Sequence, residues 1–251
     1  MKIVFPEYQN IKIQEAISRF PEVEAIKADG LESACKIIRD NTADAMVAGI
    51  DYTSRDVILA CRDGLGIVGK TFTSSFVMRR GDEILVLADV ATCKNPTEDQ
   101  LFDIVTQTYE TAKAVLNEPK IAMLSFSTLG SGGHDDSMTR IQNVVQKVHK
   151  ERPDILIDGE MQLDAAVVPE IALKKAPNSP VAGKANVLIC PDLNSGNILY
   201  KALERFGGFT AAGPILQGFN YPVSDLSRGS TVEDIVAVIE VISKLVEVKN
   251  G

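Results

Sequence analysis

The chain has no tryptophan and only two histidines, His134 and His149, in 251 residues. Its cysteines are also few and scattered: Cys35, Cys61, Cys93 and Cys190. Neither histidine combines with a cysteine at the spacing that a metal site requires, so the sequence predicts no metal centre. In a cytosolic chain, such isolated cysteines are expected to remain reduced thiols.

An excess of positive charge and long hydrophobic runs are missing as well. Asp and Glu outnumber Lys and Arg by 34 to 26, which gives a net charge of −8. This balance argues against a nucleic-acid-binding face, and an anionic ligand would have to be held by local groups of Arg and Lys. No segment has the character of a signal peptide or a membrane span, so we expect a cytoplasmic protein without membrane partners.

What is present is an ordinary globular composition, with 45% hydrophobic and 24% charged residues. Short apolar strand patterns alternate with helical patterns, which predicts a largely parallel sheet covered on both faces, an αβα arrangement of three layers. The strands are expected at residues 2–5, 24–28, 45–48, 76–79, 84–88, 121–124, 155–157 and 187–190. The helices are expected at residues 11–20, 31–41, 55–62, 97–116 and 198–206, with two more that begin near residues 137 and 231.

The stretch P-V-S-D-L-S-R-G-S-T-V-E-D, residues 222–234, contains the first candidate site. A helix-start signal follows the loop, with either Ser230 and Glu233 or Thr231 and Asp234 as the capping pair. The guanidinium of Arg228 and the neighbouring Ser227 hydroxyl therefore precede a helix N-terminus, which attracts phosphates and other anions. The alternative is an ordinary surface arginine, with an acidic residue that only complements the helix dipole.

A second candidate follows the strand at residues 121–124, where a loop rich in Gly, Ser and Thr leads into a helix. Such a loop can bind phosphate through backbone N–H groups and hydroxyls. The candidates there are Ser125, Ser127, Thr128, Gly130 and Ser131. The loop lacks the Lys-Ser/Thr ending of a P-loop, and a plain flexible connection is the alternative. Polar residues after the next strands, including Asn194 and Asn197, are further candidates because ligands bind at the carboxyl ends of parallel strands.

Several stretches, in order, resemble the phosphate acetyltransferase (phosphotransacetylase) family, whose wider relatives include phosphate butyryltransferase. They are K-I-V-F-P-E, A-D-A-M-V-A-G, A-M-L-S-F-S-T, R-P-D-I-L-I-D-G-E-M-Q-L-D-A-A, K-A-P-N-S-P-V-A-G-K-A-N-V, P-D-L-N-S-G-N, G-P-I-L-Q-G and D-L-S-R-G. The resemblance is close from about Thr71 to the end of the chain.

The resemblance implies a fold similar to the isocitrate/isopropylmalate dehydrogenases, with two α/β domains flanking a cleft. The first domain would comprise residues 1–61 and 222–251, and the second residues 62–221. It also implies exchange of acetyl-CoA and phosphate with acetyl phosphate and CoA, by a homodimer. CoA is then a substrate, and no cofactor is bound permanently.

Family roles fall on residues that this sequence retains. Ser227 and Arg228 would hold the carbonyl and phosphoryl oxygens of the acyl phosphate, Asp234 would take the proton from the CoA thiol, and Arg205 would contact a CoA phosphate. A thiol with a pKa of ~8.5 is mostly protonated at neutral pH, so a base assists its attack. The helix N-terminus would lower the pKa of Asp234 and weaken it as a base, unless burial offsets that effect.

The chain also departs from the family pattern. The N-terminal domain is short and shows no counterpart of one active-site arginine. A second arginine position corresponds to Ile58, with Arg55 one turn earlier. The alternative to a compact acyltransferase is therefore an impaired homologue that binds CoA or acyl phosphate as a sensor or partner subunit. An NAD-dependent decarboxylating dehydrogenase on the related fold is the weakest alternative, because that chemistry needs a metal-binding Asp cluster that the sequence does not offer.

Overall fold

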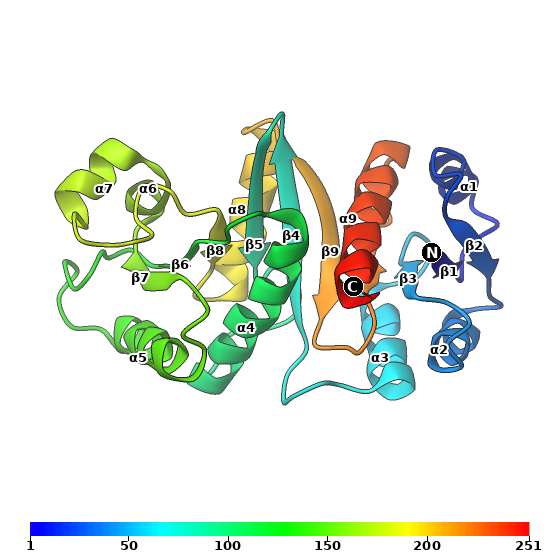
Figure 1. Cartoon of the computed structure of the whole chain (residues 1–251), viewed down its shortest axis with the longest axis horizontal. Coiled ribbons are helices and arrows are strands. Elements are labelled where there is room, and N and C mark those ends of the chain that lie inside the picture. The colour runs from blue at the N-terminus through cyan, green and yellow to red at the C-terminus, as the bar shows by residue number, and fades with distance from the viewer. Residues whose placement is uncertain (251) are drawn as a thin grey trace. The chain divides into compact units, whose positions relative to one another are not determined.

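The computed structural model describes residues 1–250, which form two compact units (Figure 1). The first unit joins Met1–Phe72 to the segment that starts at Thr210, and the second is Thr73–Phe209. Residues 62–72 and 210–221 thus belong to the first unit. For residues 210–221 the reason is that the strand starting at Thr210 pairs with the next strand of that unit. The domain boundaries expected from the sequence stay a prediction.

The five strands of the first unit lie in the order β2-β1-β3-β10-β9. Its strands are β1 (Lys2–Phe5), β2 (Glu24–Lys27), β3 (Ala45–Ala48), β9 (Thr210–Gln217) and β10 (Val223–Asp225). Strands β1, β2, β3 and β10 run parallel, whereas β9 is antiparallel to β10. All residues of β3 are apolar and buried, as expected for a strand that is covered on both faces.

The helices of this unit are α1 (Ile11–Ile17), α2 (Leu31–Arg39), α3 (Ser54–Leu65) and α9 (Val232–Asn250). Helix α1 packs against α9, and α2 packs against α3; Figure 1 shows these pairs on opposite sides of the sheet. The core between α2, α3 and the strands includes Ile38, Met46 and Val57, all completely buried. The apolar periodicity of the helices is thus explained by burial against the sheet.

The five strands of the second unit lie in the order β4-β5-β8-β6-β7. Its strands are β4 (Thr73–Arg80), β5 (Glu83–Ala88), β6 (Ile121–Leu124), β7 (Ile157–Met161) and β8 (Val187–Ile189). Strands β4 and β5 form the antiparallel hairpin that the Gly81–Asp82 turn predicts, and all the other pairings are parallel. The carboxyl ends of β5, β6, β7 and β8 therefore lie at the same edge of this sheet.

Its helices are α4 (Glu98–Val115), α5 (Asp136–Glu151), α6 (Leu163–Val167), α7 (Pro169–Lys175) and α8 (Leu193–Arg205). In Figure 1, α5 lies on one side of β6 and β7, and α6 and α7 lie on the other. Helix α4 begins with a reciprocal capping box between Thr97 and Gln100. The expected covering of a largely parallel sheet on both faces is confirmed.

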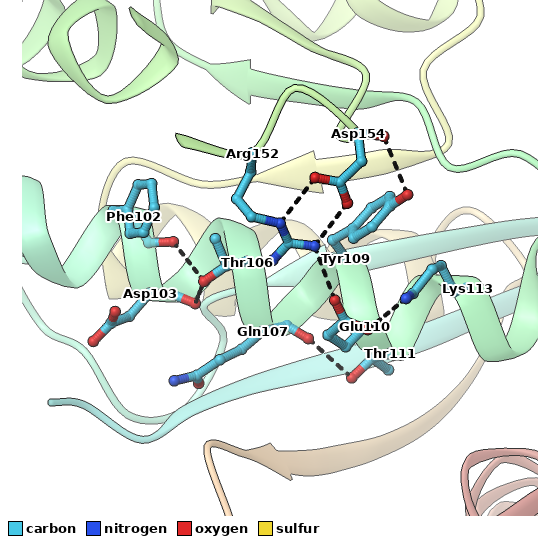
Figure 2. Close-up of polar contacts among 10 residues, drawn as sticks. All are labelled: Phe102, Asp103, Thr106, Gln107, Tyr109, Glu110, Thr111, Lys113, Arg152 and Asp154. Atoms are coloured by element: carbon cyan, nitrogen blue, oxygen red, sulfur yellow. Dashed lines mark hydrogen bonds and ion pairs between the residues drawn. The ribbon is translucent and has the colours of Figure 1, made fainter. Parts of the chain in front are cut away.

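A polar network joins α4 to the segment that follows α5 (Figure 2). The Arg152 guanidinium donates to Asp154 Oδ1 and Oδ2 at 2.9 and 2.8 Å, and to Glu110 Oε1 at 3.1 Å. The Tyr109 hydroxyl donates to the Asp154 carbonyl at 3.2 Å. Hydrogen bonds to Asp154 raise the pKa of Arg152, and the pKa of Asp154 is lowered in turn. The R-P-D part of the family-like motif is therefore structural.

Three expected elements are placed differently by the structure. The strand expected at residues 155–157 is Ile157–Met161, so Glu160 lies inside β7 rather than beyond it. The helix expected at 198–206 begins at Leu193, because the Asp192 side chain accepts the Ser195 N–H at 2.9 Å and caps it. The stretch expected to be a loop from residue 222 contains β10, which pairs with β3.

Candidate functional site

In the first unit, the candidate site is the loop that follows β10. Asp225 ends the strand and is buried, whereas Ser227, Arg228 and Gly229 are exposed. The Ser227 hydroxyl accepts the Gly229 N–H at 3.2 Å, and the Ser230 N–H closes the turn on the Ser227 carbonyl at 2.9 Å. Within residues 1–250, no hydrogen bond or ion pair joins Arg228 to another residue. Its guanidinium is therefore free to bind a ligand.

Asp234 belongs to the cap of α9. The Asp234 N–H donates to Thr231 Oγ1 at 3.2 Å, and the Thr231 N–H donates to Asp234 Oδ2 at 2.8 Å. This is a capping box, and it selects Thr231 and Asp234 over the other pair that the sequence allowed. The carboxylate thus caps the helix, and its catalytic role stays a prediction. Its other oxygen accepts no hydrogen bond among the described residues.

Two further cations lie beside the start of α9. The Lys12 ammonium donates to the Ser230 carbonyl at 2.8 Å, so it is fixed next to the loop. Arg19 is instead paired with Glu233 at 3.0 Å and is neutralised. Together with the dipole of α9, Lys12 and Arg228 make this helix start electropositive in a chain whose net charge is −8.

Two carboxylates, Glu7 and Asp225, are buried in the first unit near the loop after β3. Glu7 accepts the N–H groups of Gly49 at 2.8 Å and of Tyr52 at 3.1 Å, and also that of Asp51. Asp225 lies over Gly49, where a Cβ atom would meet its Oδ1 at 2.4 Å. Asp225 Oδ1 is buried without a hydrogen-bond partner. Burial raises the pKa of Asp225 to about 6; a Ser54 hydrogen bond opposes this shift and the Glu7 charge adds to it.

In the second unit, the Gly/Ser/Thr-rich loop after β6 encloses a carboxylate of the chain itself. Glu160, which has no exposed surface, accepts the Gly130 N–H at 2.6 Å and the Ser127 hydroxyl at 2.9 Å on Oε1. Gln142 donates to its other oxygen at 2.8 Å. Burial raises the pKa of Glu160, but the bonds from Gly130, Gln142 and Ser127 outweigh it, so the pKa lies below its usual range.

Other polar groups of this loop, in Thr128 and Gly132, are also used internally. The Gly132 N–H donates to Ser127 Oγ at 2.8 Å, and the Thr128 N–H donates to Ser131 Oγ at 3.0 Å. Thr128 Oγ1 in turn accepts the Gln162 N–H at 3.0 Å. An anion-binding loop is therefore present, but the anion that it holds in this state is Glu160. A role for Ser127, Thr128, Gly130 and Ser131 in binding substrate stays a prediction.

Ser125 lines a cavity of about 380 Å³ within the second unit. The cavity lies at the carboxyl ends of β6 and β8, where α5 and α8 begin. Apolar wall residues include Phe126, Leu163 and Leu199. The polar wall residues are Ser125, Ser137, Arg140, Asp192 and Ser195.

Asn194, Asn197 and Arg205 all lie on α8. Asn194 and Asn197 occupy its first turns instead of a loop, and Asn197 Nδ2 lies 3.5 Å from the Val90 carbonyl. Arg205, in the last turn, has a side chain that is 74% exposed and a single contact of 3.6 Å with Glu204. Its charge is therefore accessible to a ligand. Arg205 lies in the second unit, and Ser227, Arg228 and Asp234 lie in the first.

Residues 1–250 contain neither a metal-binding group of side chains nor a membrane-spanning helix. Among them, no three His, Cys, Asp or Glu side chains are grouped in a way that could hold a metal ion. No helix in this range combines the length and hydropathy that crossing a membrane requires.

Comparisons with known proteins agree with the family-like motifs. Residues 12–242 match the family model described as "Phosphate acetyl/butaryl transferase". The phosphate acetyltransferase of Clostridium acetobutylicum is 46% identical over 230 residues, which cover 87% of this chain and 68% of that protein. A solved phosphotransacetylase from Streptococcus pyogenes aligns with a TM-score of 0.90 and 32% identity, covering 98% of this chain and 94% of that one.

A more distant likeness bears on the fold alone. The 4-hydroxythreonine-4-phosphate dehydrogenase from Klebsiella pneumoniae aligns with a TM-score of 0.55 at 11% identity, covering 86% of this chain and 69% of that one. This likeness confirms the dehydrogenase-like α/β fold that the sequence predicts.

The sequence analysis missed Glu7, Asp225 and Arg140 as residues of interest. Glu7 and Asp225 each follow or end an apolar strand, so their position within a buried segment was an available signal. Arg140 lies on the otherwise ordinary polar side of α5, and nothing in its sequence context distinguishes it from Lys147 or Lys150 on the same helix.

Proposed function

Because the chain belongs to the phosphate acetyl/butaryl transferase family, we propose that it catalyses the reaction acetyl-CoA + phosphate = CoA + acetyl phosphate. CoA and acetyl-CoA are then substrates, and the enzyme binds no permanent cofactor. The observation that carries the proposal is the unpaired Arg228 guanidinium beside the Ser227 hydroxyl, at the capped N-terminus of α9.

In the direction of thioester formation, the CoA sulfur attacks the acyl carbon and the carbonyl oxygen becomes an oxyanion. Arg228 and Ser227 are donors suited to this oxyanion and to the phosphoryl oxygens, and such stabilisation is often the largest single contribution to catalysis. Collapse of the tetrahedral intermediate expels phosphate and leaves the thioester. Arg205, with its exposed charge, binds a phosphate of CoA.

Asp234 is the proposed base that takes the thiol proton. Its Oδ2 is held by the Thr231 N–H, which fixes the carboxylate and leaves one oxygen to accept the proton. The cap and the catalytic role are therefore compatible, because they use different oxygens.

The test is thioester formation from acetyl phosphate and CoA, followed by the ultraviolet absorbance of the product and by loss of free thiol. Turnover that depends on Arg228 and on CoA supports the proposal. A purified, folded chain that binds CoA without any turnover would instead select the non-catalytic sensor or partner subunit, which no observation on residues 1–250 favours. A panel of acyl phosphates of increasing chain length then separates an acetyl from a butyryl preference.

We further propose that the enzyme is a cytoplasmic homodimer. The dimer is what the resemblance to the family implies, and an acidic chain without long apolar runs fits a cytoplasmic location. Analytical ultracentrifugation of the purified chain tests the dimer, and fractionation of the source cells tests the compartment. A monomeric species that retains full turnover would reject the dimer alone.

A further inference from the structure

The cavity of about 380 Å³ in the second unit has two kinds of wall. One part is apolar and includes Phe126, Leu163 and Leu199. The other part is polar and includes Ser125 and Arg140. A small concave site with an apolar wall and a few convergent polar groups is typical of a ligand site. This cavity therefore suits a ligand with an anionic group next to a small apolar part.

Arg140 is the cation of this cavity and has no partner in the protein. Its Nε atom is buried without a hydrogen bond, and no bond or ion pair joins its guanidinium to the described residues. Leaving a buried charged donor unsatisfied is costly, so such groups are normally paired. On the same helix, the Lys147 ammonium is paired with Asp99 Oδ1 at 2.8 Å. On helix α5, the protein therefore satisfies Lys147 but leaves the buried Nε of Arg140 without a partner.

Of the hydroxyl groups around the cavity, some have an acceptor within the protein and one does not. Ser137 donates to Asp135, and Ser195 donates to Asp192 at 3.2 Å, so both hydroxyls have protein acceptors. The Ser125 hydroxyl has no partner among residues 1–250. Asp192 is the one carboxylate of the wall; it caps α8 by accepting the Ser195 N–H at 2.9 Å, and the helix dipole offsets its charge. The unused donors are thus Arg140 and Ser125.

The elements that carry these two donors are fixed to the same buried carboxylate. Gln142, two residues after Arg140, donates to Glu160 Oε2 at 2.8 Å. The loop that begins with Ser125 is held to Glu160 Oε1 through Gly130 and Ser127. Because both walls are anchored before a ligand arrives, little ordering is required on binding.

We propose that Arg140 and Ser125 form an anion subsite that binds a phosphate group. The guanidinium offers several N–H donors in one plane, which match phosphate oxygens, and the hydroxyl supplies one more donor. The inference rests on the proposed function, whose substrates carry phosphate in two forms. One is inorganic phosphate or acyl phosphate, and the other is the phosphate groups of CoA.

Isothermal titration calorimetry tests the subsite with three probes: inorganic phosphate, CoA and dephospho-CoA, which lacks the 3′-phosphate. Arg140→Met keeps the apolar stem and removes the charge, and should weaken binding of the affected probe roughly 10- to 100-fold. Arg140→Lys should lose less, and Ser125→Ala should weaken binding by about 5-fold. Lys147→Met, on the same helix, is the matched control and should bind all three probes as the wild type does.

The probes separate the two sources of phosphate. Weaker binding of inorganic phosphate alone places the acyl-phosphate group at Arg140. Weaker binding of CoA with unchanged binding of dephospho-CoA places the 3′-phosphate there. Unchanged affinity for all three probes in folded Arg140→Met would overturn the subsite. If that variant does not fold, Arg140→Lys and Ser125→Ala decide in the same way.

Failure of the subsite and failure of the proposed function are distinguishable. A wild-type chain that binds phosphate through Arg140 but forms no thioester would reject the acyltransferase reaction and keep the subsite. An active wild type whose Arg140→Met variant shows unchanged KM for phosphate and for CoA would reject the subsite and keep the reaction.

Discussion

The loop after β10 and the loop after β6 both contain Ser and Gly residues, but most of their donors are used differently in the structure. Both combine Ser and Gly residues with a helix that follows, which is why both are candidates for anion binding. In the loop after β6, the Ser127 hydroxyl and the N–H groups of Thr128, Gly130 and Gly132 are spent on Glu160 and on hydroxyls of the same loop. In the loop after β10, Arg228 has no partner among residues 1–250.

The comparison shows that a motif supplies donors but does not reveal their acceptors. A buried carboxylate from a strand that is distant in the sequence can occupy an anion-binding loop and turn it into a structural element. A similar arrangement recurs where Glu7 accepts the N–H groups of Gly49 and Tyr52, which lie more than 40 residues away. Free donors are therefore a better sign of ligand binding than donor-rich sequence.

Removal of the acceptor from the loop after β6 should have the largest effect. Glu160→Ala leaves Gly130, Ser127 and Gln142 without their acceptor, and should lower the free energy of unfolding by about 3–5 kcal/mol. Urea denaturation followed by circular dichroism measures it. Glu170→Ala, an exposed residue of α7, is the control and should change stability by less than about 0.5 kcal/mol. A similarly small loss for Glu160→Ala would mean that Glu160 does not organise the loop.

The opposite behaviour is expected for the loop after β10. Arg228→Met should lower kcat/KM about 100- to 1,000-fold, since it removes a charge that stabilises the oxyanion, while stability should stay within about 0.5 kcal/mol. Steady-state kinetics and thermal unfolding measure the two effects. Arg19→Met, whose guanidinium is paired with Glu233, is the control and should retain nearly full activity. Wild-type turnover by Arg228→Met would show that Arg228 has no role in catalysis.

Asp225 makes the first unit sensitive to pH. Its pKa is about 6 in the folded chain against an ordinary value of 3.8, so the folded state binds more protons between these values. Its contribution to stability is therefore fully present below about pH 4 and is lost as pH rises to about 6. Asp225→Asn should abolish this decrease in stability with rising pH and should stabilise the chain at pH 7.5 by about 2–3 kcal/mol.

Urea denaturation of the wild type and of Asp225→Asn at pH 4 and pH 7.5 measures this difference. Asp234→Asn, in the same unit, is the control because it should leave the fall with pH in place. Parallel stability profiles for the wild type and Asp225→Asn would show that the buried carboxyl does not titrate in this range.

The smallest effect separates the cap of α9 from the proposed chemistry. Thr231→Ala removes the acceptor of the Asp234 N–H and should cost about 1 kcal/mol of stability, with little change in kcat. Asp234→Asn keeps an oxygen that can accept the Thr231 N–H, but it cannot take a proton, so kcat should fall about 100-fold or more. Equal kcat losses in the two variants would assign Asp234 to the cap alone.

The sequence predicted most of the elements but misplaced several polar ones. Strands β1, β3 and β6 have the expected bounds, because apolar runs between polar turns leave little choice. Strand β7 was misplaced because Asp158 and Glu160 interrupt its apolar pattern. Glu160 is nevertheless buried, since it accepts hydrogen bonds from the loop after β6. The start of α8 was missed because Asp192 and Ser195 suggest a turn as readily as a helix cap.

By itself, the sequence determined the α/β class, the family and the helix start next to Arg228, because each follows from local pattern or from residues in a fixed order. Only the tertiary structure decided which donors remain free. Glu160 satisfies the loop after β6 from a neighbouring strand, while Arg140 is left without an acceptor in a cavity lined by four separate segments. A hydrogen-bond acceptor that arrives from 30 residues away leaves no trace in the local sequence, and so no local pattern can reveal it.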